Sequence, residues 1–132
     1  MTDPINPSYY ERDGVRCADF RAHLPTFVSD AFKYIWRAGE KGDAIEDLKK
    51  AEWYLREAIR LGLRVEKEKR RTLAGMYCEF GFSAEPGTKK FEALAVIVSD
   101  QPRQALDWVR DLIRELEAEK ADAERAEAGK EE

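Results

Sequence analysis

Histidine and cysteine are scarce in this sequence. His23 is the only histidine, and Cys17 and Cys78 are the only cysteines. None of the three has a histidine or cysteine neighbour at the spacing of zinc ligands, so no metal site is expected from these residue types. Two cysteines are also too few for a disulfide framework, and we expect both to be reduced thiols.

Long apolar runs are absent as well. A membrane helix needs about 18 or more consecutive apolar residues, and the sequence contains no such run. Residues 1–14 also lack the basic and apolar regions of a signal peptide. The sequence therefore predicts a cytoplasmic protein that does not span a membrane.

The sequence motifs of the common nucleotide-binding enzymes and hydrolases are missing too. There is no Gly-x-x-x-x-Gly-Lys-[Ser/Thr] phosphate loop and no Gly-x-Gly-x-x-Gly, and there is no Gly-x-Ser-x-Gly elbow. The composition, 43% hydrophobic and 38% charged, is ordinary for a soluble, helix-rich protein. Without a resemblance to a known family, these residues indicate no enzyme class.

The acidic charge lies mainly at one end of the chain. The net charge is −4, and residues 115–132 hold eight acids and three bases, so the rest of the chain is close to neutral. From residue 117 onward only Ala, Glu, Lys, Asp, Arg and Gly occur, which cannot bury apolar area. We therefore expect one helical domain over residues 1–120 and a disordered acidic tail over residues 121–132.

The stretch 27–60 predicts two helices joined by a short turn. The first helix is apolar on almost every side, with Phe32 and Trp36 in one apolar row, as is typical of a buried helix. Gly39 suits the positive φ of a helix C-terminus, and Asp43 is a good N-cap for the second helix. We therefore predict a helical hairpin at the centre of an all-α bundle of about five helices.

Each helix of this hairpin carries a narrow polar stripe. The spacing i, i+3, i+7 places three residues on one face of each helix: Asp30, Lys33 and Arg37 on the first, and Asp47, Lys50 and Tyr54 on the second. Charges on a largely buried helix need a partner or a ligand. The facing stripes are therefore either a phosphate-binding site or internal ion pairs, Asp30–Lys33 and Asp47–Lys50.

The other segments are expected to pack around the hairpin. Residues 1–14 predict an extended N-terminal arm rich in turn residues, anchored by Tyr9 and Tyr10. Short helices are expected over 15–24 and 91–98. Asp100 is expected to cap a last amphipathic helix that has Pro102 near its start.

A basic run occupies residues 64–71, with five bases and two acids. We expect it to be a solvated helix face, with a phosphate-facing patch as the alternative. No aromatic residue interrupts this run, so a single-stranded nucleic-acid groove is not expected.

These residues also resemble the SaV-like family of small bacteriophage proteins, over roughly residues 5–60. The matching elements are Asn6-Pro7-Ser8-Tyr9-Tyr10, Gly14-Val15-Arg16-Cys17-Ala18-Asp19, Asp30-Ala31-Phe32-Lys33-Tyr34-Ile35-Trp36-Arg37, Gly39-Glu40-Lys41 and Glu46-Asp47-Leu48-Lys49-Lys50-Ala51-Glu52-Trp53-Tyr54-Leu55. Two positions depart from the family pattern. Its usual histidine is Tyr9 here, and its usual asparagine is Asp30.

The resemblance implies a nucleotide protein in the host cytoplasm, because the family includes a coliphage kinase of deoxynucleoside monophosphates that lacks a P-loop. Phosphoryl transfer depends mostly on positioning and charge stabilisation. The nucleotide phosphates would meet Lys33, Arg37 and Lys50, with Tyr54 beside them and Tyr9 or Tyr10 covering the base. If the missing histidine has an acid–base role, the protein binds nucleotide without turnover.

Two alternatives stay open beside this interpretation. In the first alternative, Asp30, Asp43 and Asp47 form a Mg²⁺ site beside the nucleotide, which we favour less than a nucleotide site without metal. The other function class is a non-enzymatic interaction module, such as a phage factor that binds a host protein. In either class we expect a homo-oligomer, because the apolar helix faces exceed what a small monomer easily buries.

Overall fold

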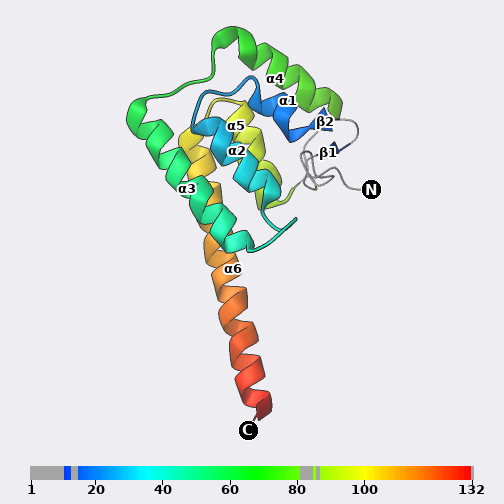
Figure 1. Ribbon diagram of the computed structural model, residues 1–132, viewed down its shortest axis with the longest axis vertical. Coiled ribbons are helices and arrows are strands. Elements are labelled where there is room, and N and C mark those ends of the chain that lie inside the picture. The colour runs from blue at the N-terminus through cyan, green and yellow to red at the C-terminus, as the bar shows by residue number, and fades with distance from the viewer. Residues whose placement is uncertain (1–10, 13–14, 81–84, 86, 132) are drawn as a thin grey trace.

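The computed structural model is an all-α bundle, and in its described part six helices follow a two-stranded ribbon (Figure 1). The structure describes residues 11–12, 15–80, 85 and 87–131. The helices are α1 (Cys17–Arg21), α2 (Val28–Arg37), α3 (Ala44–Leu61), α4 (Lys67–Phe80), α5 (Lys89–Val98) and α6 (Pro102–Glu131). The prediction of an all-α fold built around a central hairpin is confirmed.

The α2–α3 hairpin forms as the sequence predicts. Asp43 is the N-cap of α3, and its Oδ1 accepts hydrogen bonds from the backbone N–H groups of Ile45 and Glu46, at 2.9 and 3.3 Å. Gly39 has the positive φ, 86°, expected after α2. Phe27, predicted as the first apolar residue of the helix, is instead its N-cap and has a φ of 67°.

The hydrophobic core lies between the hairpin, α1, α5 and α6. Its largest fully buried side chains include Trp36, Phe20, Phe32, Leu48 and Leu55. The rings of Phe20, Phe32 and Trp36 contact one another at centroid distances of 5.4–6.1 Å. Helix α3 packs on both α2 and α6, and α5 packs on α6. Buried aromatic and aliphatic residues of this kind dominate core stability.

The short helices differ from expectation mainly at their ends. The helix expected over 15–24 is limited to α1, because Val15–Arg16 (β2) pairs antiparallel with Glu11–Arg12 (β1). The helix expected over 91–98 is confirmed as α5, which Thr88 caps through a 3.2 Å hydrogen bond from the Phe91 N–H group. Residues 1–10 and 13–14, most of the predicted arm, lie outside the described residues.

The end of the chain also differs from expectation. Helix α6 continues to Glu131 through the segment predicted as a disordered tail, and it projects from the bundle (Figure 1). Every side chain from residue 117 to 130 is exposed. Alanine, glutamate and lysine have high helix propensity, which accounts for a helix that continues where its side chains are exposed.

No helix in the described part of the chain is both long enough and apolar enough to cross a membrane.

Candidate functional site

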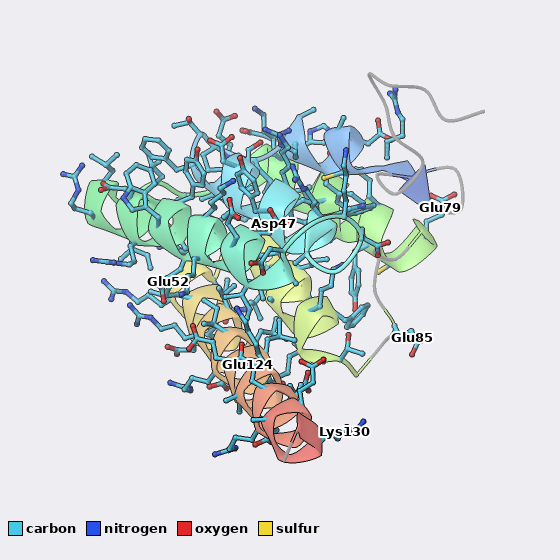
Figure 2. All side chains as sticks on the ribbon, turned by 60° about the horizontal axis from the view of Figure 1, so that its bottom comes forward. Asp47, Glu52, Glu79, Glu85, Glu124 and Lys130 are labelled. Atoms are coloured by element: carbon cyan, nitrogen blue, oxygen red, sulfur yellow. The ribbon has the colours of Figure 1, made fainter. Side chains whose placement is uncertain are left out.

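The predicted polar stripes do face one another, but only one ion pair crosses the hairpin. Arg37 Nε on α2 lies 3.4 Å from Asp47 Oδ2 on α3. The Asp47 side chain is buried where α3 meets α2 (Figure 2). Within the described part of the chain, Asp47 Oδ2 accepts no hydrogen bond. The contact is therefore held by charge, and the Arg37 side chain stays 30% exposed beside the buried carboxylate.

Burial raises the pKa of Asp47, and the positive charges of Arg37 and Lys50 oppose that rise. The nearby carboxylates of Glu46 and Asp43 add to it. The ionised form of Asp47 is thus less favourable in the folded protein than in water, even with Arg37 beside it. This is the usual balance at a buried ion pair, where desolvation offsets much of the attraction.

The other predicted charges have different partners from those expected. Asp30 Oδ1 lies 3.3 Å from the Arg21 guanidinium of α1, which also donates a hydrogen bond to Ser29 Oγ at 3.0 Å. Lys50 Nζ lies 3.3 Å from Glu46 on its own helix. The expected pairs Asp30–Lys33 and Asp47–Lys50 are therefore not the ones that form.

Tyrosine rings and lysines cluster on the outer side of the hairpin. The rings of Tyr34 and Tyr54 stack at a centroid distance of 5.9 Å and an interplanar angle of 7°. The ammonium groups of Lys33 and Lys50 lie 5.4 and 5.3 Å from the centre of the Tyr34 ring. Three of the predicted site residues, Lys33, Lys50 and Tyr54, are thus brought together around Tyr34. Tyr34 itself lies outside the polar stripes that the sequence predicts.

Two further aromatic residues extend this cluster. The Phe27 ring lies 6.1 Å from Trp53 and 6.0 Å from Tyr54, and Trp53 meets Tyr54 edge to face at 5.2 Å. Trp53 is 51% exposed, which is unusual for so large an apolar side chain. We call the set Lys33, Tyr34, Lys50, Trp53 and Tyr54 the aromatic–lysine surface.

The left-handed backbone of Phe27 is a strained feature beside this surface. A bulky residue at positive φ is rare, and such strain often occurs at functional positions. An open hollow of about 500 Å³ adjoins the surface, and Lys49, Lys50 and Trp53 line part of it. The hollow gives a ligand room beside the exposed Trp53 ring. Tyr9 and Tyr10, the other predicted base contacts, lie outside the described residues.

The carboxylates of the alternative Mg²⁺ site are not brought together. Asp30 pairs with Arg21, Asp43 caps α3, and Asp47 pairs with Arg37. Among the residues that the structure describes, no group of three histidine, cysteine, aspartate or glutamate side chains could hold a metal ion. Burial raises the pKa of the Cys17 thiol to about 12, so this cysteine is an inert core residue.

Lys90 is a partly buried charge that sequence analysis missed. Its ammonium group donates a 2.8 Å hydrogen bond to the Ala38 carbonyl, just after α2, and lies 3.6 Å from Glu40. Burial lowers the pKa of Lys90, and the Glu40 carboxylate opposes that change. A cation at a helix C-terminus meets the unpaired carbonyls there. Lys90 therefore joins α5 to the end of α2, close to the Arg37–Asp47 pair.

A second buried carboxylate, Asp100, connects the α5–α6 turn to the start of the predicted basic run. Its Oδ1 accepts a 2.9 Å hydrogen bond from the Val65 N–H group, and its Oδ2 lies 2.9 Å from both Arg64 and Arg70. Asp100 was expected to cap α6, but its φ of 61° directs the carboxylate to these partners instead. Two arginines of the run are therefore bound to a core carboxylate, which corrects its interpretation as a wholly solvated face.

Comparison with known proteins places the hairpin within a shared domain. Residues 5–56 match the model of a family described as a protein of unknown function, DUF3310. The match covers less than half of the chain but includes α1, α2 and most of α3. No curated protein and no solved structure matches the chain. The matched segment contains the whole aromatic–lysine surface.

Proposed function

We propose that this protein binds a nucleotide on the aromatic–lysine surface of the α2–α3 hairpin. The observation that carries the proposal is the pair of ammonium groups beside the stacked Tyr34 and Tyr54 rings. A nucleotide has an aromatic base and an anionic phosphate, and rings beside cations offer a partner for each. Exposed Trp53 is the ring most open to a base.

Two lysines supply the positive charge at this surface, whereas Arg37 pairs with Asp47. Lys33 is half-buried and Lys50 is exposed, so both ammonium groups lie where a phosphate can reach them. Lysine meets a phosphate as a point charge on a flexible stem. Arg37 instead neutralises Asp47 beneath this surface. We therefore assign the phosphate contact to Lys33 and Lys50, and no longer to Arg37.

Phosphoryl transfer is the finer part of the proposal, and it rests on the resemblance of residues 5–60 to the SaV-like phage family. Catalysis of this kind depends on charge placement rather than on a covalent protein intermediate. The substrate class would be a nucleoside or deoxynucleoside monophosphate. Nucleotide binding is the part that the described side chains support directly.

A structural or protein-binding hairpin is the second candidate, and the internal ion pairs favour it. Arg37–Asp47 and Arg21–Asp30 already use three of the charges on the predicted polar stripes, namely Arg37, Asp47 and Asp30. In this alternative the stacked tyrosines and their lysines fix the hairpin, because each cation–π contact contributes about 0.5–1 kcal/mol at an exposed site. The exposed Trp53 would then contact a partner protein, such as a host protein bound by a phage factor.

A thermal-shift screen separates the two candidates. The protein is heated with nucleoside and deoxynucleoside mono- and triphosphates, with free nucleosides and inorganic phosphate as controls. A nucleotide that binds only the native state stabilises it by about 2.7 kcal/mol at 100 times its dissociation constant. A nucleotide-specific rise in the melting temperature supports binding, and the absence of a shift across the panel overturns the proposal. Chromatography of the mixture with ATP then tests for transfer.

A further inference from the structure

One face of α6 changes from basic to acidic along its length. Arg103, Arg110, Glu117 and Glu124 follow one another at intervals of seven residues, a spacing that keeps side chains on one face of a helix. All four are exposed. Arg103 and Arg110 lie beside α3, where they line a shared hollow with Arg56 and Arg60. Glu124 lies farther along α6, toward its projecting end (Figure 2).

A shallow groove between α3 and α6 runs along the basic half of this face. It has a volume of about 460 Å³ and is lined by four arginines and one carboxylate, Asp107, together with the apolar side chains of Ile59 and Leu106. The arginines are Arg56 and Arg60 of α3 and Arg103 and Arg110 of α6. The groove is therefore strongly basic in a chain whose net charge is −4.

The charges on this face are only partly neutralised within the chain. Arg110 lies 3.2 Å from Glu52, and Lys49 lies 3.2 Å from Glu117. Within the described residues, Arg103, Asp107, Lys120 and Glu124 are among the charged side chains of α6 that have no ion pair.

Among the described residues, the projecting half of α6 has little support from its own chain. Glu117 pairs with Lys49, and Lys120, Ala121 and Glu124 share a shallow hollow with Ile45 of α3. Its side chains are exposed from residue 117 to 130, and isolated helices of this length are marginal in water unless they are packed. A surface that covers it should be basic, because the segment is acidic, and should be long enough for several helical turns. The α3–α6 groove of a second copy has both properties.

We propose that two copies of this chain form a symmetric dimer in which their α6 helices pair antiparallel. The projecting half of each α6 then lies along the arginine-lined groove of its partner. In an antiparallel pair, residues whose numbers have the same sum lie opposite one another. One register pairs Arg103 with the partner's Glu124, Asp107 with the partner's Lys120, and Arg110 with the partner's Glu117.

This register has no like-charge conflict among those positions, and Leu106 falls opposite the partner's Ala121. Each contact occurs twice, because a twofold axis repeats it. A dimer of this kind closes on itself, unlike a head-to-tail contact, which would produce filaments. The self-complementary order of the charges is the reason for choosing a second copy rather than a nucleic acid or another acidic protein.

A pair of charge-reversed variants tests the dimer. R103E/R110E makes the whole face acidic, and E117R/E124R makes it basic. We expect the wild type to sediment at twice its 15.2 kDa chain mass. Each variant alone should dimerise at least about tenfold more weakly, because attraction becomes repulsion at every symmetric contact. An equimolar mixture of the two variants should form a heterodimer in which every reversed contact is again attractive.

The control is E119R/D122R, which makes the same charge change as E117R/E124R but on another face of α6. It should leave dimerisation unchanged, and circular dichroism checks that every variant keeps its helix content. High salt should weaken the wild-type dimer, since exposed charges are screened. A wild type that stays monomeric at micromolar concentration, a dimer unaffected by the reversals, or variants that fail to pair with each other would each overturn the proposal.

Discussion

The guanidinium of Arg37 on α2 lies 3.4 Å from the buried carboxylate of Asp47 on α3, measured from Nε to Oδ2. This ion pair occupies the hairpin position where the sequence predicted a phosphate contact. We therefore expect the stability of the fold to depend on Arg37, whereas Lys33 and Lys50 are the cations of the aromatic–lysine surface. The two kinds of charge should therefore respond differently to substitution.

Arg37→Ala should destabilise the protein by about 2–4 kcal/mol, because it leaves the Asp47 carboxylate buried without its cation. Urea denaturation measures the change. The double variant Arg37→Ala/Asp47→Asn is the control, and it should recover part of the loss because the orphaned charge is gone. A double variant as unstable as the sum of the two single changes would show that the residues are not coupled.

Asp47 should give the free energy of unfolding a specific pH dependence. Burial raises its pKa above the ordinary 3.8 in the folded state, so the folded protein holds this proton more tightly than the unfolded chain. The contribution of Asp47 to the free energy of unfolding is therefore fully present below pH 3.8, and it is lost as the pH rises through the higher pKa of the folded state.

Asp47→Asn removes that titration. The urea midpoint of the variant, relative to the wild type, should improve as the pH rises through the same range. A difference between the two proteins that is independent of pH would contradict the assignment.

Asp100→Ala should cost about 2–4 kcal/mol. It removes the acceptor of the Val65 N–H group and the carboxylate that Arg64 and Arg70 share, and alanine tolerates the φ of 61° poorly. Asp100→Asn should cost less, since asparagine accepts the same hydrogen bond and adopts this backbone more readily.

Asp111→Ala is the matched surface control for Asp100. It breaks the exposed pair with Arg114 and should change stability by less than about 1 kcal/mol. If thermal denaturation shows equal losses of stability for Asp100→Ala and Asp111→Ala, the buried Asp100 contacts contribute no more to stability than an exposed ion pair.

Leu48→Ala should destabilise the hairpin by roughly 2–5 kcal/mol, because Leu48 is 2% exposed and its removal leaves a cavity. Leu61→Ala is the same chemical change at a position that is 48% exposed, and its effect should be under about 1 kcal/mol. An unchanged urea midpoint for Leu48→Ala would mean that this face of α3 does not pack in the core.

Local signals in the sequence were sufficient for most of the helices. The apolar period of 27–60, the Asp43 cap and Gly39 predicted the hairpin, because helix formation and capping depend on residues within one or two turns. The same signals failed at the end of the chain. Low hydrophobicity there predicted disorder, whereas the high helix propensity of alanine and glutamate carries α6 to Glu131.

The long-range polar contacts could not be predicted from the sequence. Arg64 and Arg70 meet Asp100, and Lys90 reaches the Ala38 carbonyl. These partners are far apart in the sequence, so their pairing depends on how α4 and α5 pack and not on any local pattern. Helical spacing placed Lys33 on one polar stripe and Lys50 and Tyr54 on the other, and the structure brings the three together around Tyr34. It did not show that Tyr34 would lie among them, because a tyrosine has both an apolar ring and a polar hydroxyl group and so fits a core or a surface position equally well.

Titration calorimetry of the nucleotide with the strongest thermal shift tests the central claim most directly. Wild type, the double variant Lys33→Ala/Lys50→Ala, and Lys67→Ala are compared after circular dichroism confirms that each is folded. Lys67 is an exposed lysine on α4 and is the matched control. We predict that Lys67→Ala binds as the wild type does, and that the double variant binds at least about tenfold more weakly because it loses both phosphate-facing cations. A folded double variant with wild-type affinity would contradict the aromatic–lysine surface as the nucleotide site.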